Sequence, residues 1–193
     1  MSAAEERGAS PPANPPVARG GRAAPAFERL WDGLYGSPIY PLLLPRLGGS
    51  RPACLLTDIW PGDGARGRTL MGGVLMEDAS GVPLGGEPWN NGTIADALQR
   101  FAWLRDLRAV GGINSRQRAR DLVRGWLDRY ETWHAFAWRP ELIAERLCAW
   151  LAAYAFFADS ADDAFQARLL TSVARQARHL GRVMGRMGRG HER

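Results

Sequence analysis

The stretch WHAFAWRPELIAERLCAWLAAYAFF (residues 133–157) decides the fold of this chain. Its aromatic residues allow two interpretations: a sugar-stacking acid–base site, or the apolar seam of a helical domain. Pro140 suits the first turn of a helix, because the amide that proline lacks would be unpaired there anyway. The apolar residues that follow recur every three or four positions, and they are Leu142, Ile143, Leu147, Trp150, Leu151 and Tyr154. This spacing predicts a helix that buries them, which favours the second interpretation.

The same spacing predicts three more helices around this one. Their apolar stripes are Ile94, Leu98, Phe101, Leu104 and Leu107; then Ala119, Leu122, Val123, Trp126 and Tyr130; and, after residue 160, Phe165, Leu169, Val173, Ala177, Leu180, Met184 and Met187. The expected boundaries are a capping box at Thr93 and Asp96, an end at Gly111-Gly112, a cap at Ser115, and a start at Ser160 backed by Asp162 and Asp163. Four helices with short links predict antiparallel hairpins and a mostly α fold.

The segment before these helices lacks a regular period. Glycine and proline interrupt residues 27–92, which predicts an irregular region with short helices and a possible β-hairpin. Its strands are expected at 69–76 and 82–84. Residues 1–26 are rich in Pro, Ala, Gly and Ser, so we expect a disordered leader.

Glycine also recurs through the last residues, GRVMGRMGRGHER. Glycine destabilises a helix interior by about 1 kcal/mol, so the last helix should fray there. The helical domain is therefore expected over residues 93–187, with a disordered tail at 188–193. We expect a chain that stops partway through its architecture, because a helical array buries a continuous core only by stacking neighbours.

The charge of the chain excludes few function classes. All 25 basic residues are arginine, and the formal net charge is +5. Between Arg100 and Arg129 the arginines alternate with aspartates, which is typical of a solvated, salt-bridged helix face. A nucleic-acid-binding surface would gather its positive charge into one stripe with interleaved aromatic residues. Arg19-Gly20-Gly21-Arg22 is only a weak RGG-like piece, so nucleic acid is the less favoured partner.

The sequence shows no local pattern of a metal site. Cys54 and Cys148 form no CxxC pair, and the three histidines have no HxH or HxxxH spacing. Asp58 and Asp63 in TDIWPGDG do not match the alternating acidic residues of a calcium loop, so a structural turn is preferred. We expect no cofactor. Without a signal peptide or a run of about 18 apolar residues, no membrane partner is expected and a cytoplasmic location is the default.

Five strings carry a resemblance to a known family: LWDGLYGSPIYPLLL, DIWPGDGARGRTLMGGVL, FAWLRDLRAVGG, WHAFAWRPELIAERLCAWL and LLTSVARQARHLGR. In this order they resemble, over about residues 27–185, the amino-terminal part of bacterial heparinase II/III-like proteins. The family implies an α/α toroid followed by a large β-sandwich. The fold class expected here is therefore mostly α: antiparallel helical hairpins that form part of an incomplete α/α toroid, preceded by an irregular region with possible short strands.

The resemblance implies β-elimination on a uronic-acid-containing polysaccharide. In that reaction an electrophilic group neutralises the uronate carboxylate, and a Tyr or His moves the proton. The family takes its catalytic residues from later helices and from the β-sandwich, so none is carried over. We expect an amino-terminal fragment of a polysaccharide lyase, inactive by itself, with an anionic polysaccharide as partner. The alternative is a non-enzymatic helical module that binds an anionic glycan or a protein.

Four residues are the candidates for substrate binding: Trp89, Asn90, Trp138 and Arg139. At the rim of a toroid, Trp138 would stack on a sugar and Arg139 would bind its carboxylate. A helix start in which Trp138 packs on Leu142 also accounts for that motif, and this interpretation is favoured. Asn90 and its neighbour suit a ligand contact and a turn equally well.

Two histidines are weighed as proton-transfer groups. His134 lies between two expected helices, with no acidic residue beside it in the sequence to orient the ring. It is therefore interpreted as a surface or capping residue. His179 is flanked by arginines and is interpreted as a residue on the flank of the last helix.

Overall fold

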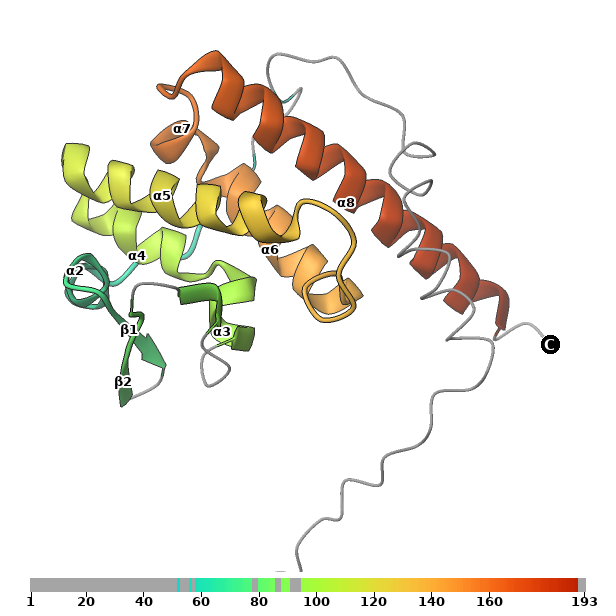
Figure 1. Cartoon of the computed structure of the whole chain (residues 1–193), viewed down its shortest axis with the longest axis horizontal. Coiled ribbons are helices and arrows are strands. Elements are labelled where there is room, and N and C mark those ends of the chain that lie inside the picture. The colour runs from blue at the N-terminus through green and yellow to red at the C-terminus, as the bar shows by residue number, and fades with distance from the viewer. Residues whose placement is uncertain are drawn as a thin grey trace, which may run out of the picture.

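The structure is a computed structural model that describes residues 52, 56, 58–77, 80–85, 88–90 and 95–190. The predicted leader lies outside these residues, as do Cys54, Thr93, Ile94 and residues 191–193 of the predicted tail. The described part is mostly helical, with one small sheet of two antiparallel strands (Figure 1). This confirms the mostly α class with short strands. That the helices form part of an incomplete α/α toroid stays a prediction.

A short helix and a hairpin open the described part. Helix α2 (Gly64–Met71) begins at Asp63, whose Oδ1 accepts hydrogen bonds from the amides of Ala65 and Arg66 at 2.7 and 3.2 Å. Strand β1 (Val74–Glu77) then pairs with β2 (Ser80–Pro83). The predicted β-hairpin is present, but its strands lie at 74–77 and 80–83 instead of 69–76 and 82–84. The capped helix, which has no apolar stripe, extends into the first of the predicted strands.

The helix expected to run from residue 93 to Gly111 is two helices. After the 3₁₀ turn η2 (Pro88–Asn90), α3 (Ala95–Arg100) ends before α4 (Trp103–Val110). Phe101 separates them with a φ of 59°, a left-handed conformation that costs a non-glycine residue about 1 kcal/mol or more. Its ring is fully buried, 5.0 Å from Trp103 and 5.2 Å from Trp150 between ring centroids. The packing of the buried ring offsets the cost of this backbone conformation. An apolar stripe in the sequence does not reveal that such a break will occur.

Helix α5 (Gly112–Tyr130) follows α4 without a linker. Gly111, with a φ of 69°, ends α4, as its sequence predicted. Ser115 does not cap α5, so the cap predicted at this residue was wrong. It lies inside the helix, and its Oγ donates to the carbonyl of Gly111 at 2.5 Å. The apolar stripe of α5 is buried throughout.

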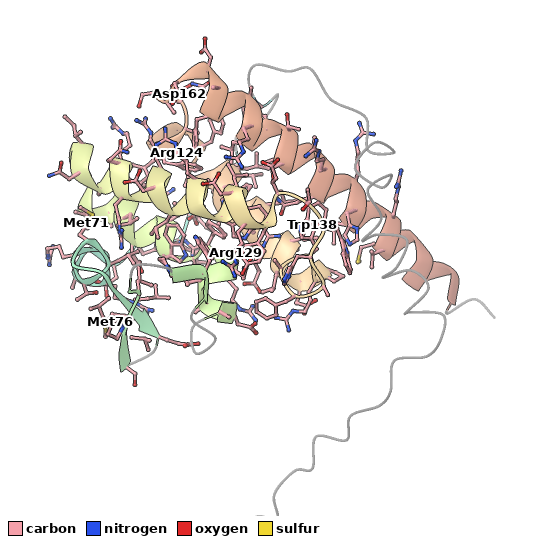
Figure 2. The ribbon with its side chains drawn as sticks, in the orientation of Figure 1. Met71, Met76, Arg124, Arg129, Trp138 and Asp162 are labelled. Carbon is pink, nitrogen blue, oxygen red and sulfur yellow. The ribbon has the colours of Figure 1, made fainter. Side chains whose placement is uncertain are left out.

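Helix α6 (Pro140–Ala152) begins with Pro140 in its first turn, as predicted. It ends earlier than expected, so that Tyr154 belongs to a separate turn, α7 (Tyr154–Phe157). Helix α8 (Asp163–Gly190) begins after Asp162, whose Oδ1 accepts from the amide of Phe165 at 2.8 Å. Ser160 was therefore the wrong cap. Figure 2 shows Asp162 near Arg124 of α5, and their ion pair of 3.1 Å joins the two helices.

The stripe predicted for α8 is partly wrong. Phe165 and Leu169 are buried, but Ala177 and Met184 are exposed. The buried positions that continue the helical period are polar, and they are Ser172, Gln176 and His179. The prediction selected apolar residues. The helix instead buries the residues of its inner face, polar ones included, at a period of 3.6 residues.

Candidate functional site

The two tryptophans of the predicted substrate site are internal. Trp138 is only 3% exposed, and its indole N–H donates to the carbonyl of Tyr130 at 2.8 Å. Trp89 is also buried, and its carbonyl accepts from the Tyr130 hydroxyl at 3.1 Å. The structure thus joins both tryptophans through Tyr130.

Arg139 lies at the surface, apart from this internal chain. Its Nη2 donates to Asp96 Oδ1 at 2.7 Å, and its guanidinium carbon lies 4.8 Å from the centroid of the Phe136 ring. Of Asn90, at the end of η2, only the backbone is described. A shared role of these four residues in substrate binding stays a prediction.

The structure places the two histidines in different surroundings. His134 Nδ1 accepts from the amides of Phe136 and Ala137 at 3.2 and 3.3 Å, so it is a capping residue, as interpreted from the sequence. Partial burial, then the charge of Arg129, lower the pKa of His134. The His179 ring is buried and lies 5.4 Å from that of Trp138. It is a core residue, so its placement on the helix flank was wrong.

Sequence reasoning also missed Arg146, the largest charged side chain in the core. Its Nε donates to Gln176 Oε1 at 2.7 Å, its Nη1 to Gln99 Oε1 at 3.2 Å, and its Nη2 to the Ala137 carbonyl at 2.9 Å. Burial lowers the pKa of Arg146 to about 9. Within the apolar stripe of α6, its only sequence signal is a charge at a core position.

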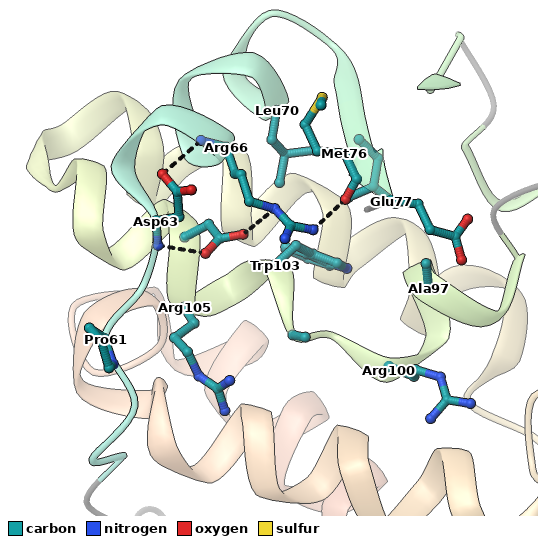
Figure 3. A pocket seen from close by; sticks show the side chains of 13 residues that line it. Pro61, Asp63, Arg66, Leu70, Met76, Glu77, Ala97, Arg100, Trp103 and Arg105 are labelled. Atoms are coloured by element: carbon teal, nitrogen blue, oxygen red, sulfur yellow. Dashed lines mark hydrogen bonds and ion pairs between the residues drawn. The ribbon is translucent and has the colours of Figure 1, made fainter. Parts of the chain in front are cut away.

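Two cavities lie at the joint between α3 and α4. One cavity of about 390 Å³ lies on the side of α2 and β1, as Figure 3 shows, and a second of about 460 Å³ lies on the side of α6. The two cavities share Arg100, Ala102 and Arg105. We call this combined feature the arginine groove.

Ion pairs line the arginine groove. In the first cavity, Arg66 lies 3.7 Å from Asp106 and donates to the carbonyl of Met76 at 2.6 Å (Figure 3). Arg100 pairs with Glu145 across to α6. These pairs hold the arginines in fixed positions between the helices. Each arginine that lines the two cavities therefore has a neighbouring carboxylate.

Asp58 organises the entrance to the second cavity. Its Oδ2 accepts from Arg105 Nε at 2.7 Å and from Arg108 Nη2 at 3.3 Å. Its Oδ1 accepts from the amide of Trp60 at 3.1 Å. Burial by itself would raise the pKa of Asp58, but the hydrogen bonds from Arg105 and Trp60 and the two arginine charges outweigh it and lower that pKa. Asp58, like Asp63, is a structural turn residue, as expected.

Large apolar side chains stand at the same entrance. Trp60 is 64% exposed, Ile59 is 81% exposed, and Leu56 is also exposed. Trp60 and Leu56 line the second cavity. Contiguous exposed apolar residues beside ordered polar groups are typical of a protein-binding surface.

Other kinds of site find less support in the part of the chain that the structure describes. No group of three or more His, Cys, Asp or Glu side chains there could hold a metal ion. None of its helices is both long enough and apolar enough to cross a lipid bilayer. Cys148 is a free, exposed thiol at the edge of the arginine groove.

Comparison with known proteins adds one relative. This chain is similar to an FtsZ-localized protein. It is 37% identical over 166 residues to FtsZ-localized protein C of Caulobacter vibrioides (strain NA1000 / CB15N). The match covers 82% of this chain but only 28% of the relative, so the chain spans less than a third of the relative's length. No protein-family model matches the chain, and no solved structure gives a significant match.

This finding corrects the expected family. The matching relative is named for its localisation with FtsZ, so the assignment to heparinase II/III-like proteins was wrong, and so was the interpretation as a fragment of a polysaccharide lyase. The strongest string, AWRPELIAERLCAWL, contains a proline at a helix start and apolar residues at helical spacing. Any helix with a buried face needs those residues, so the string was not specific for a sugar-cleaving family.

Proposed function

We propose that this chain is a helical protein-interaction module that localises with an assembly containing FtsZ. The observation that carries the proposal is the 37% identity to FtsZ-localized protein C, which extends over 82% of the chain. A match over so much of the chain includes the helices that build the core and the arginine groove. An anionic polysaccharide partner has no support from that relative.

The arginine groove and its entrance are the proposed contact surface. Tryptophan and arginine are over-represented among the residues that contribute most to protein–protein binding. Trp60 projects apolar surface beside the ion pair of Arg105 with Asp58. Burying a tryptophan in a partner's pocket contributes on the order of 2–4 kcal/mol. The neighbouring arginine would orient the partner through its remaining donors.

Co-sedimentation with FtsZ polymers tests the proposal directly. The purified 193-residue chain is mixed with FtsZ in GTP, and the amount that pellets is compared with that in GDP, where polymers are absent. We expect the chain to pellet with the polymers. A fluorescent fusion of the same chain should follow FtsZ in cells. A chain that stays in the supernatant and spreads evenly through the cell would overturn the proposal.

A pair of double variants tests the location of the surface. Ile59→Ala with Trp60→Ala should weaken co-sedimentation at least about tenfold, because both side chains are exposed and Trp60 lines the second cavity of the groove. The matched control is Ile113→Ala with Met184→Ala, at positions 78% and 56% exposed on α5 and α8. This control removes exposed apolar side chains elsewhere and should bind as the unaltered chain does. Equal loss in both variants would exclude the groove entrance as the contact.

A further inference from the structure

Three arginines of α5 hold the connection between α7 and α8 in place. They are four residues apart, so they share one face of α5 and lie about 6 Å apart along its axis. Their contacts are from Arg116 Nε to the Phe156 carbonyl at 2.9 Å, from Arg120 Nε to the Phe157 carbonyl at 2.7 Å, and from Arg124 Nη2 to Asp162 Oδ2 at 3.1 Å. We call Arg116, Arg120 and Arg124 the arginine ladder. Figure 2 shows its last member, Arg124, beside Asp162.

The arginine ladder also contacts a serine hydroxyl. Arg120 Nη2 donates to Ser160 Oγ at 2.8 Å. Ser160 is exposed and lies in the turn between α7 and α8, outside both helices. The other serines of residues 95–190, Ser115 and Ser172, are buried. Ser160 is therefore the serine of this range that is accessible to solvent, and a guanidinium group already holds it.

Positive charge accumulates around this hydroxyl. Within the described part of the chain, the ion pairs of the arginine ladder are those of Arg124 with Asp121 and Asp162. Arg116 and Arg120 donate instead to neutral oxygens. Burial, then the charges of Arg116 and Arg124, lower the pKa of Arg120, and the charge of Asp162 offsets this only in part. A further negative charge in the turn would therefore be stabilised.

The sequence around Ser160 suits a phosphate acceptor. Asp159 precedes it, and Asp162 and Asp163 follow at the second and third positions. Protein kinases that select acidic substrates recognise such residues through basic side chains of their own. Ser160 is the only serine or threonine of residues 95–190 with an acidic residue three positions later.

We propose that Ser160 is a phosphorylation site, and that the arginine ladder binds the phosphate and fixes the start of α8 on α5. A protein kinase would transfer the γ-phosphoryl group of ATP. A bond forms between Ser160 Oγ and the γ-phosphorus, the bond from that phosphorus to an oxygen of ADP breaks, and the hydroxyl proton passes to a base of the kinase. The ester then carries nearly two negative charges and three acceptor oxygens. This site is independent of the proposed association with FtsZ.

The surroundings suit a phosphate better than a neutral hydroxyl. Because Arg120 Nη2 already points at Oγ, its planar guanidinium can bind phosphate oxygens through parallel hydrogen bonds. A phosphate just before α8 also lies at the positive end of the helix dipole. The carboxylate of Asp162 opposes it, but Arg124 and the Phe165 amide already compensate that charge. Phosphorylation should therefore stabilise the fold.

Phosphoserine incorporated during translation in place of Ser160 tests the contact directly. Thermal denaturation of the full chain at pH 7 should show a midpoint about 3–6 °C higher than that of the unmodified chain. The matched control carries phosphoserine in place of Ser80, an exposed residue of β2 to which the described arginines make no contact. Its midpoint should change by less than about 1 °C. An unchanged or lower midpoint with the phosphate at position 160 would overturn the proposal.

Arg120→Gln separates the arginine ladder from a general effect of charge. Each variant is compared with and without the phosphate at position 160, so that loss of the contact with the Phe157 carbonyl cancels. Arg120→Gln should remove at least about half of the rise in midpoint. Arg118→Gln removes the same charge two residues away on another face of α5 and should preserve the rise. An equal loss in both variants would exclude the ladder as the phosphate's partner.

Phosphorus NMR keeps the test valid if the Arg120 variant does not fold. The second ionisation of phosphoserine has a pKa of about 6 in water, and neighbouring guanidinium groups favour the dianion. The pKa of the phosphate at position 160 should therefore lie clearly below that of the phosphate at position 80. Equal pKa values at the two positions would contradict binding by the ladder.

A kinase reaction tests whether Ser160 is an acceptor in the folded chain. The unaltered chain is incubated with ATP and an acidophilic casein kinase, and mass spectrometry locates the phosphate. We expect modification of Ser160, and its loss in Ser160→Ala. A chain in which Ser160 stays unmodified while other residues react would show that the turn is closed to a kinase, and would overturn the assignment.

Discussion

The guanidinium carbon of Arg146 lies 4.3 Å from the centroid of the Trp126 ring, and both side chains donate to the same oxygen, Oε1 of Gln99. A charged side chain and an aromatic ring thus share one acceptor at the centre of the helices. The remaining donors of Arg146 reach Gln176 of α8 and the carbonyl of Ala137. Arg146 therefore ties α3, α5, α6 and α8 together through neutral acceptors.

Replacing Arg146 by Met should lower the free energy of unfolding by about 2–4 kcal/mol. Methionine fills much of the volume, but it leaves the Ala137 carbonyl and the Gln176 amide oxygen buried without a donor. Urea denaturation followed by tryptophan fluorescence measures the change. Arg129→Met, at an exposed position, should change stability by less than about 0.5 kcal/mol. If Arg146→Met costs no more than this control, the network does not stabilise the core.

Asp58 should make stability depend on pH in the acid range. Its folded pKa is lowered below the ordinary 3.8, so its ion pairs stabilise the fold above that value. This stabilisation is lost as pH falls through the lowered pKa, because the carboxyl group then takes up a proton. Asp58→Asn should therefore cost about 1 kcal/mol at pH 7, and the cost should shrink as pH falls through the lowered pKa.

Urea denaturation from pH 2 to pH 7 measures this difference. The control is Asp121→Asn, which removes an exposed carboxylate that pairs with Arg124 of its own helix at 3.6 Å. The control should cost less than about 0.5 kcal/mol at pH 7. A cost of Asp58→Asn that persists unchanged at pH 2 would mean that charge is not the source of the effect.

Trp138 and Arg139 are neighbours in the sequence, but substitution of Trp138 should cost more stability than substitution of Arg139. Trp138→Phe removes the hydrogen bond to the Tyr130 carbonyl and part of a buried ring, so it should lower stability by about 1–2 kcal/mol. Arg139→Gln removes surface ion pairs and should change it by less than about 0.5 kcal/mol. Thermal denaturation of the two variants compares them. Equal effects would contradict the division between an internal and a surface residue.

Local rules predicted those parts of the fold that local energies decide. Pro140 begins α6 and Gly111 ends α4, because the preferences of both residues depend on the backbone at one position. The stripe of α5 is buried as expected. The break at Phe101 could not be predicted, since four aromatic rings from separate segments stabilise its strained backbone.

The candidate sites were less predictable than the helices. Asp58 accepts hydrogen bonds from the Trp60 amide and from Arg105, and so brings the two residues together at the arginine groove. Because Trp60 and Arg105 lie far apart in the sequence, this arrangement could not be predicted from it.

Two glycines of this chain separate the effect of packing from that of helix propensity. A Cβ on Gly67 of α2 would lie 2.3 Å from the Asp106 carbonyl oxygen and 2.6 Å from Val110 Cγ2, so Gly67 lets α2 approach α4 closely. Gly67→Ala should therefore lower the free energy of unfolding by about 1–3 kcal/mol, although alanine favours a helix. The methyl group of the alanine cannot be accommodated unless α2 and α4 move apart.

Gly181 of α8 is the matched control, because a Cβ there would meet no atom within 4 Å. Gly181→Ala should raise the free energy of unfolding by about 0.5–1 kcal/mol, since alanine restricts the unfolded chain and favours the helix. Urea denaturation of both variants measures the two signs in one experiment. Stabilisation by both substitutions would show that α2 does not pack on α4 through Gly67. The placement of α2 beside the first cavity of the arginine groove would then be wrong.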